Sequence, residues 1–393
     1  MELVLETAGE SHGPCLVAIL AGLPTGTPVD AAFVDARLAA RQRGYGRSGR
    51  QRVEQDHARF LAGVRDGFAT GNPIAIQVDN RDTTYVGRPP VHTPRPGHAD
   101  LAGALNRGIL DAREVVERAS ARETAVRVAA GAVAASFLAA LGCTVLGHVV
   151  AIGGVSVGGV SVGGGDFGAG PEDDLEAARV RRDASDLHAF GAAAAQDAAR
   201  ARIAEAASHG DTLGGVVEVV ATGVPAGLGG HERPEDKMSS RLAAACMGIQ
   251  AVRGVELGLG FASAALLGSA VQDGILPAVG SGPPRREGNR AGGIEGGTTN
   301  GRPVVVRCAM KPLATLRTPL PSVDLRTGAP ADARVERSDV TAVPALAIVA
   351  EAVVAMELAR AIRRRFGGAH LDEVRAALGA HRRRMEAVGR RDA

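Results

Sequence analysis

Tryptophan is absent from this chain of 393 residues, and aromatic residues of every kind make up only 3% of it. Apolar residues still account for 45%, so the core must be packed mainly by small side chains such as Ala, Val and Leu. Glycine is abundant, with 53 residues, which indicates many loops with special backbone angles or close approach to a ligand. The length allows two or three average domains or one large mixed α/β domain.

Cysteine is scarce and widely spaced, with no CxxC pair: Cys15, Cys143, Cys246 and Cys308. This spacing favours neither a zinc or other metal site nor a disulfide framework, so we expect the reducing cytoplasm as the compartment. The formal net charge of +2 is too small to hold the protein on nucleic acid or a membrane by bulk charge. The acidic first ten residues do not resemble a secretory signal, and the run 125–141 predicts a buried helix rather than a membrane span.

Apolar periodicity predicts strands at 3–8, 16–20, 214–222 and 303–308, and paired strands within 61–78. The same signal predicts helices at 31–42 with Asp30 as the N-cap, from 101 to about 117, from about 124, and at 192–208, 233–247, 344–363 and from 372. We interpret the glycine tract 153–170, which repeats Ser-Val-Gly-Gly, as a surface connection without chemistry.

Two histidines lie in short polar motifs. Arg95-Pro96-Gly97-His98-Ala99-Asp100 places His98 at a loop-to-helix junction, where a histidine can pass protons beside an anion held by Arg95. The alternative is a helix cap or a surface residue. The second motif, Gly-Glu-Ser-His-Gly at 9–13, separates two predicted strands, and its alternative is an ordinary hairpin turn facing water.

Arginines and glycines alternate in the segment 41–50, which contains four arginines. Guanidinium groups bind phosphate or carboxylate through paired donors, so this loop is a candidate anion site. A solvated charge run or an RNA-binding segment are the alternatives, although Tyr45 is the only aromatic residue near enough to stack on a base.

Two further segments carry ligand-binding signals. Ser120 at a helix start beside Arg122 is suited to phosphate, or is a plain capping box with Glu123, and both interpretations can hold. The loop 289–301 has five glycines that let backbone amides approach a ligand, without P-loop or dinucleotide spacing.

Together these motifs resemble chorismate synthase over nearly the whole chain. Six segments occur in the order of that family: 9–13, 44–47, 95–100, 120–124, 289–301 and 337–339. The resemblance implies an α+β fold, a layered β-α-β sandwich with helices between two antiparallel sheets, as one domain over 1–393 that assembles into a homotetramer. It also implies a lyase of the shikimate pathway of aromatic amino acid biosynthesis, which converts 5-enolpyruvylshikimate 3-phosphate to chorismate and phosphate by 1,4 anti-elimination.

The resemblance assigns roles to individual residues. His12 would protonate the departing phosphate, His98 would protonate reduced flavin, and Asp339 would relay the proton at flavin N5. The substrate would contact Ser11, Arg41, Arg47, Arg95 and Arg122. The flavin would contact Arg118, Ala119, Ser120, Ala121, Gln250, Ala251, Gly296, Lys311, Pro312, Leu313, Ala314, Thr315 and Arg337. Ala314 stands where relatives often have Ser, and Ser338 where many have His.

The implied cofactor is reduced FMN, which is not consumed, with NADPH involved only indirectly as a reductant. The sequence has no clear nicotinamide fingerprint, which favours reduced flavin supplied by an external flavin reductase. Two alternatives remain at this point. A conventional flavin reductase would consume NADPH steadily, and an anion- or RNA-binding protein would show salt-dependent affinity without turnover.

Overall fold

Two antiparallel sheets form the outer layers of the protein. The computed structural model describes residues 2–48, 55–158, 175–278, 283–336 and 338–388. The first sheet has the order β1-β2-β6-β3, from β1 (Val4–Ala8), β2 (Cys15–Ala21), β6 (Ile74–Asp79) and β3 (Ala58–Ala62). Alternate side chains of β2 and β6, such as Leu16 and Ile76, point inward and are fully buried. The predicted strands at 3–8 and 16–20 and the pairing within 61–78 are confirmed.

The second sheet has the order β10-β15-β9-β7-β8 and is also antiparallel. Its strands are β7 (Thr144–Ile152), β8 (Val155–Ser156), β9 (Gly215–Thr222), β10 (Val252–Leu257) and β15 (Val304–Met310). Val217, Val219 and Val306 on its inner face belong to the main core. The strands predicted at 214–222 and 303–308 are therefore confirmed.

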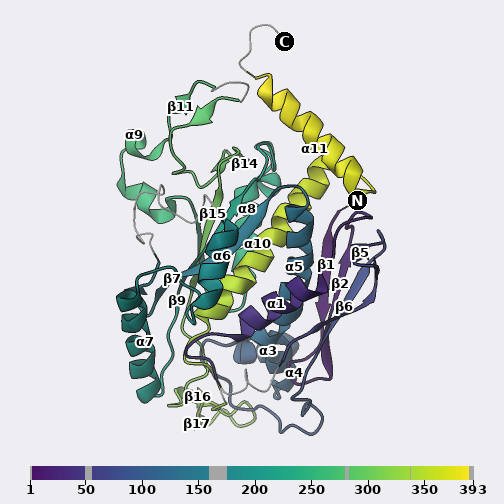
Figure 1. Cartoon of the computed structure of the whole chain (residues 1–393). Coiled ribbons are helices and arrows are strands. Elements are labelled where there is room, and N and C mark those ends of the chain that lie inside the picture. The colour runs from purple at the N-terminus through teal and green to yellow at the C-terminus, as the bar shows by residue number, and fades with distance from the viewer. Residues whose placement is uncertain (1, 49–54, 159–174, 279–282, 337, 389–393) are drawn as a thin grey trace.

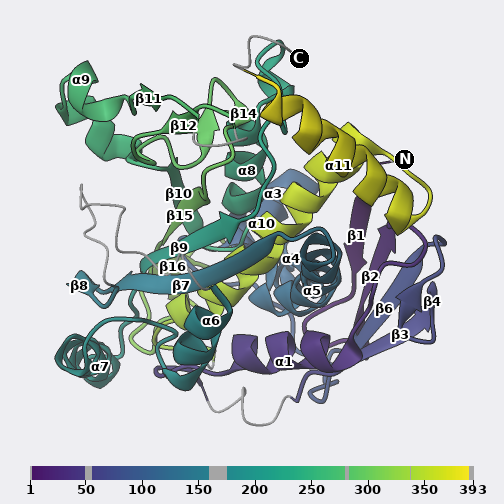
Figure 2. The same cartoon turned by 45° about the horizontal axis from the view of Figure 1, so that its top comes forward.

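Helices α5 (Thr124–Ala139) and α10 (Val343–Phe366) lie between the two sheets, and α1 (Ala31–Gln42) crosses beside them (Figure 2). Small residues let α5 and α10 approach closely, since a Cβ atom on Gly131 would lie only 2.4 Å from that of Ala352. One continuous core contains residues from both sheets and all three helices. The predicted β-α-β sandwich is confirmed.

The remaining elements surround this sandwich (Figure 1). They are β4 (Val64–Arg65), β5 (Phe68–Ala69), α3 (Ala99–Arg107), α4 (Arg113–Ala119), η1 (Ala121–Glu123), α6 (Leu175–Ala184), α7 (Ala193–Ser208), η4 (Pro234–Asp236), α8 (Met238–Met247), η5 (Gly260–Ala265), α9 (Gly268–Val271), β11 (Ile275–Leu276), β12 (Arg285–Arg286), β13 (Ile294–Glu295), β14 (Thr298–Thr299), β16 (Pro321–Val323), β17 (Pro330–Asp332) and α11 (Leu371–Glu386). No helix among the described residues is long and apolar enough to span a membrane.

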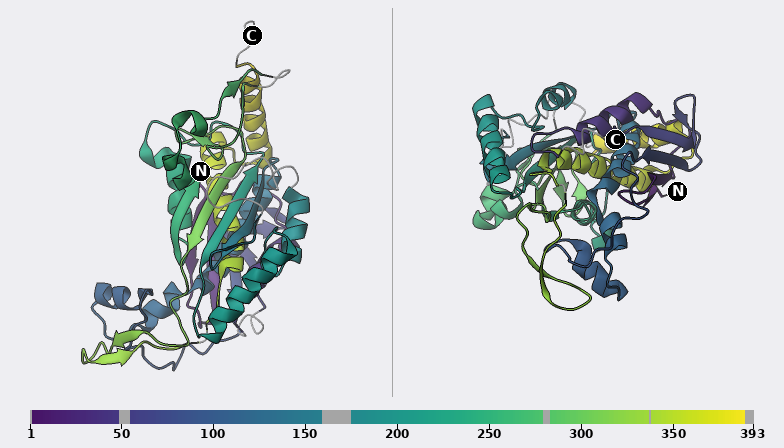
Figure 3. Two further views of the ribbon diagram at one scale, coloured as in Figure 1. Left: turned by 90° about the vertical axis from the view of Figure 1, so that its left-hand side faces the viewer. Right: turned by 90° about the horizontal axis from the view of Figure 1, so that it is seen from below.

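Helices α3 and α4 and the β16–β17 hairpin project together from the body (Figure 3). A small separate core joins them, in which Val91, Ala104, Ala112 and Val116 are buried and Leu325 packs against them. The backbone N–H of Leu325 also donates to the carbonyl of His92. This projection supports one end of the sandwich.

Two predicted helices are each divided in the structure. The helix predicted from 101 to 117 ends at Gly108, whose φ of 65° lies in the left-handed region that favours glycine, and α4 starts afterwards. The helix predicted at 233–247 begins as the one-turn η4, and extended Lys237 separates it from α8. Of the glycine tract, Gly153 and Gly154 turn β7 into β8, while 159–170 lies outside the described residues.

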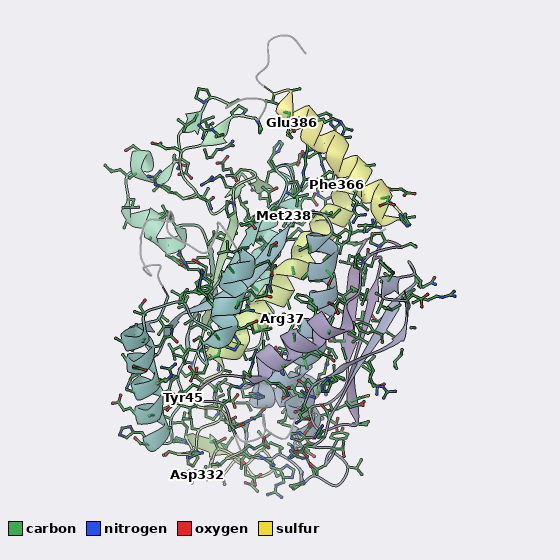
Figure 4. All side chains as sticks on the ribbon, viewed as in Figure 1. Arg37, Tyr45, Met238, Asp332, Phe366 and Glu386 are labelled. Atoms are coloured by element: carbon green, nitrogen blue, oxygen red, sulfur yellow. The ribbon has the colours of Figure 1, made fainter. Side chains whose placement is uncertain are left out.

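Buried charge links α6 to the central helix. Glu351 of α10 accepts hydrogen bonds from Arg179 at 2.7 Å, from Arg182 and from the backbone N–H of Gly147. Burial alone would raise the pKa of Glu351, but the two arginines and nearby Arg37 lower it to about 2. Figure 4 shows Arg37 near the crossing of α1 and α10. The carboxylate is therefore ionised inside the protein.

Asp30 caps α1 as the sequence predicts. Its Oδ1 accepts from the backbone N–H of Ala32 at 2.9 Å and of Phe33 at 3.3 Å. We expect Asp30→Ala to lower the free energy of unfolding by about 1 kcal/mol, because two amides lose their acceptor. Chemical denaturation measures this change. Asp30→Asn retains an acceptor oxygen and is the matched control, so an equal loss in both variants would contradict the capping role.

Candidate active site

A cavity of about 690 Å³ is lined in part by residues of α3 and α4. Figure 1 shows these two helices at one end of the sandwich. The cavity volume is within the range of about 300–1,000 Å³ that is usual for small-molecule sites. Its polar lining comes from seven separate segments: Ser11 and His12, Arg41 to Ser48, Arg95 to His98, Glu117 to Thr124, Gln250 to Arg253, Lys311 to Thr315, and Glu336 with Ser338 and Asp339. Residues distant in sequence thus share one enclosure.

Most of the predicted site residues line this cavity. They are His12, His98 and Asp339, then Ser11, Arg41, Arg47, Arg95 and Arg122, and finally Ala119, Ser120, Ala121, Gln250, Ala251, Lys311, Leu313, Ala314 and Thr315. Arg337 lies outside the described residues. Three predicted flavin contacts are not among the lining residues: Arg118, Pro312 and Gly296.

Arg118 and Gly296 have other surroundings. Arg118 donates to the backbone carbonyls of Thr7 and Gly9 and so anchors the end of β1. Gly296 lies in the turn between β13 and β14, before β15, whereas Lys311 follows β15. The seven residues of β15 span roughly 23 Å at about 3.3 Å per residue. A single chain does not bring Gly296 to the cavity.

His12 lies in the turn between β1 and β2, which is buried instead of facing water. Ser11 is 3% exposed and His12 8% exposed. His12 Nδ1 lies 3.0 Å from Glu117 Oε2, and the same oxygen accepts from the backbone N–H of His12 at 3.0 Å. Ser120 Oγ donates to Ser11 Oγ at 3.1 Å. The hairpin interpretation is right for the backbone but wrong for the exposure of the turn.

His98 occupies the N-cap position of α3, but its side chain makes no capping hydrogen bond. The ring instead contacts the buried carboxylate of Asp100, and Arg95 Nη2 lies 3.1 Å from His98 Nδ1. Asp100 also accepts from Arg95 Nε at 2.8 Å. Burial alone would raise the pKa of Asp100, but the hydrogen bonds from His98 and Arg95 hold it well below its usual range.

Arg41 and Arg122 share a buried carboxylate, Asp56. Asp56 accepts from Arg122 Nη1 at 2.6 Å and from Arg41 Nη1 at 3.3 Å. Arg41 Nε also donates to Thr124 Oγ1, at 2.9 Å. Burial lowers the pKa of Arg41 to about 9, against the attraction of Asp56, so the guanidinium remains charged at neutral pH. Both arginines are thereby fixed in orientation.

The ion pair of Arg47 is longer than those of Arg41, Arg95 and Arg122. Its Nε lies 3.4 Å from Asp339 Oδ2, and this buried Nε has no hydrogen-bond partner in the described part of the chain. Asp339 is itself fixed by the backbone N–H of Ser48, which donates at 2.6 Å. The Nε of Arg47 is therefore available to an anion.

Part of the cavity lining is apolar. The apolar lining residues include Val116, Ile249, Val252, Met310, Leu313, Leu346 and Val349. Beside them, Gln250 Oε1 is buried with no hydrogen-bond partner among the described residues, which fits a ligand N–H donor. Ala251 has φ of 66°, a strained conformation for a residue with a side chain. These features fit a flavin ring with its polar edge at Gln250.

The sequence of this chain is similar to that of proteins named chorismate synthase. The sequence model of the family described as Chorismate synthase matches residues 3–362. The chorismate synthase of Desulforudis audaxviator is 49% identical, with 97% of each chain covered. That of Trichlorobacter lovleyi is 49% identical, over 94% of this chain and 96% of its own. The chain belongs to the chorismate synthase family.

A solved structure agrees with this assignment. The chain is similar to one titled "Crystal Structure of Chorismate Synthase", with a TM-score of 0.81, 36% identity, and coverage of 98% of this chain and 99% of that one. As a member of the chorismate synthase family the chain is an enzyme, a carbon–oxygen lyase of the shikimate pathway acting on phosphate (EC 4.2.3.5). The cavity that gathers the family motifs is its candidate active site.

The sequence did not predict which acids pair with the histidines and arginines of the site. Asp56, Asp100 and Glu117 carry no signal of their own, because each becomes significant only through a histidine or arginine that the fold brings to it. Arg253 also lines the cavity and, with burial, lowers the pKa of Lys311. The capping-box interpretation holds only in part. Ser120 Oγ accepts from the N–H of Arg122, but Glu123 accepts from Thr7 and Arg127.

Asp100→Asn should lower the free energy of unfolding at neutral pH by about 3–5 kcal/mol, the usual cost of breaking a buried ion pair. The folded-state pKa of Asp100 is below its ordinary value of 3.8, so its stabilisation is present above pH 3.8 and is lost as the pH falls further. The difference between wild type and variant should therefore shrink below about pH 3.8 in urea unfolding measured against pH.

Exposed Asp332 of β17 provides the matched control, and Figure 4 shows it at the same end of the molecule. Asp332→Asn should change the free energy of unfolding by no more than about 0.5 kcal/mol. Equal effects of the two variants, or a difference that does not vary with pH, would contradict the buried pairing of Asp100.

Proposed function

We propose that the enzyme converts 5-enolpyruvylshikimate 3-phosphate to chorismate and phosphate by 1,4 anti-elimination, using reduced FMN with no net redox change. The observation that carries the proposal is the convergence of two histidines, five arginines and several apolar side chains on one cavity. A purely anion-binding site has no use for two imidazoles paired with buried carboxylates. A conventional flavin reductase has no use for the arginine set.

The substrate carries two carboxylates and a phosphate, and the cavity offers complementary charge. Arg41, Arg95 and Arg122 are oriented in advance by buried carboxylates, so less conformational entropy is lost when an anion binds. Arg47 has a buried Nε without a hydrogen-bond partner among the described residues, and Ser11 adds a hydroxyl. At about 1.5–3 kcal/mol for each charge-assisted hydrogen bond, these groups can anchor the substrate after desolvation costs.

The two histidines handle separate protons in this proposal. His12 protonates the departing phosphate, and His98 would supply a proton to reduced flavin when it is bound. Asp339 relays the proton at flavin N5, and its bond from the backbone N–H of Ser48 keeps the carboxylate oriented for this task. The two rings come from different elements, the β1–β2 turn and the start of α3.

Reduced FMN would be held by Ala119 to Ala121, Gln250 to Ala251 and Lys311 to Thr315. When bound, it would donate electron density transiently and take up the proton from the substrate ring. Gln250 binds a ring N–H, Lys311 supplies positive charge, and the apolar lining excludes water. Ala314 offers no hydroxyl where relatives often have Ser, and Ser338 replaces the imidazole that many have beside Asp339.

The proposal also covers the source of the reduced flavin, the compartment and the oligomeric state. Reduced FMN comes from an external flavin reductase in the cytoplasm, with NADPH as the indirect reductant. The chain acts as one domain in a homotetramer, which sedimentation analysis can test. Gly296 belongs to the flavin site only if that assembly brings it to a cavity.

Turnover should require reduced FMN without consuming it, because the elimination has no net redox change. An anaerobic assay with the shikimate-derived substrate and chemically reduced FMN measures chorismate and flavin together. The expected result is many turnovers for each flavin with the flavin still reduced. Chorismate formation at full rate after flavin removal would overturn the proposal, and steady NADPH consumption without chorismate would favour a reductase.

Arg47→Lys should weaken substrate binding more than the retained charge suggests, because lysine lacks the paired planar donors of arginine. We expect KM to rise by roughly tenfold, equivalent to about 1.4 kcal/mol. The control is Arg326→Lys, since Arg326 is exposed and paired with Asp324 away from the cavity. An unchanged KM and rate in Arg47→Lys would return this loop to the status of a solvated charge run.

His12→Ala and His98→Ala should each lower the rate by about 10²–10⁴, the usual contribution of a general acid or base. Flavin and substrate binding should largely remain. In addition, His98→Ala should alter the absorbance of bound reduced flavin, and His12→Ala should leave that spectrum nearly unchanged. Stopped-flow spectra and steady-state rates measure both effects.

Melting curves must accompany these kinetics, because a purely structural histidine would lower stability and leave turnover of the folded fraction intact. His57→Ala is a suitable control, since that side chain is 69% exposed and pairs with Asp35 outside the cavity. Identical flavin spectra in the two site variants, with equal rate losses, would refute the division of labour between His12 and His98.

A further inference from the structure

We propose that Glu117 is a positioning residue for His12, which fixes the ring so that Nδ1 carries the proton and Nε2 is the reactive nitrogen. The inference rests on the proposed function for the proton-transfer role of His12. The position of the ring and its tautomer are properties of the free protein and can be measured independently of that role.

The tautomer follows from the hydrogen bonds. Glu117 Oε2 lies 3.0 Å from His12 Nδ1, and an ionised carboxylate can only accept, so Nδ1 must donate. In the neutral ring Nε2 is then the unprotonated nitrogen. Nε2 lies 3.7 Å from Asp82 Oδ2, which is too long for a hydrogen bond. The nitrogen that can exchange a proton with a ligand is therefore Nε2, on a residue that lines the cavity.

Glu117 holds the main chain of the turn as well as the ring. The backbone N–H of His12 donates to Oε2 at 3.0 Å, and the N–H of Ser11 donates to the backbone carbonyl of Glu117 at 3.2 Å. The last turn of α4 thus fixes both the position of the 9–13 turn and the rotation of its imidazole. A side chain that served only to fill space would not make two hydrogen bonds to His12.

The carboxylate of Glu117 is itself held rigid and ionised. Its side chain is fully buried, and Oε1 accepts from Arg113 Nη1 at 3.2 Å, with Arg88 Nη1 at 3.9 Å. Burial alone would raise the pKa of Glu117, but hydrogen bonds and charge from His12, with Arg113, hold it below its usual value. The negative charge beside Nδ1 stabilises the imidazolium formed when Nε2 takes a proton.

Solid-state NMR of the protein with ring-¹⁵N histidine, at pH 8 and without ligands, tests the tautomer directly. The signals of His12 are identified by their loss in a His12→Gln sample. We expect the wild-type signals of a protonated Nδ1 and a bare Nε2, and loss of that pattern in Glu117→Gln. The matched control is Glu114→Gln on the same helix, where Glu114 accepts from Tyr85 at 2.5 Å and is not a cavity residue. This control should leave the His12 signals unchanged.

Kinetics provide the second measurement. Glu117→Gln should lower kcat by roughly 10²-fold with little change in KM, the lower end of the effect of losing a general acid. A protonated Nε2 in the wild-type protein overturns the proposal even if the variant does not fold, as does an unchanged His12 pattern in Glu117→Gln. If the wild type forms no chorismate, the lyase proposal fails, while the NMR comparison still decides the role of Glu117.

Discussion

Buried carboxylates hold the cations of this cavity in place, and the rest of the site depends on that pairing. Asp56 binds Arg41 and Arg122, Asp100 binds Arg95, and Glu117 binds Arg113. A buried guanidinium without a partner would cost several kcal/mol, so a cluster of arginines beneath the surface requires such acids. Asp100 and Glu117 each bind an arginine of their own segment, whereas Asp56 binds arginines 15 and 66 residues away and joins three segments into one structure.

This arrangement also determines what the site can do for a ligand. An arginine fixed by a carboxylate before the substrate arrives presents its remaining donors in a set direction, which is the advantage of preorganisation. The same acids reduce the net positive charge of the cavity, so affinity relies on geometry more than on bulk attraction. Arg47 differs, because its 3.4 Å approach to Asp339 leaves its Nε without a described partner. This Nε is therefore available to a bound anion.

The elements with strong local signals were predictable from the sequence. Asp30 begins α1 with the expected cap, and apolar runs predict β9 and β15. Local signals did not reveal that α3 and α4 are separate, because the break depends on the left-handed backbone of Gly108 and on packing of Ala104 against Val116. The layered arrangement came from the family resemblance, since periodicity alone does not order sheets.

The acidic partners in the site were beyond sequence reasoning for a physical reason. Asp56 and Arg122 are 66 residues apart, and Glu117 and His12 are 105 apart, so no local spacing connects them. Asp100 lies close to the motif histidine His98, but it also lies in the first turn of α3, where an acidic residue is common in any helix. Only the folded contacts distinguish an acid that stabilises the helix dipole from one that holds a catalytic ring.

Gly296 and Lys311 are the opposite case, because they are close in sequence but separated in the structure. They lie fifteen positions apart in family motifs that sequence reasoning assigned to one flavin site, yet the strand between them is extended and separates its ends by roughly 23 Å. An extended strand moves the chain away from a site by the largest distance for each residue. The turns at residues 9–13 and 248–251 bring the chain back toward it. Residues that follow a strand share a site with those that precede its antiparallel neighbour, as Lys311 after β15 does with Ala251 before β10. Their proximity is a consequence of sheet register, which a motif list does not contain.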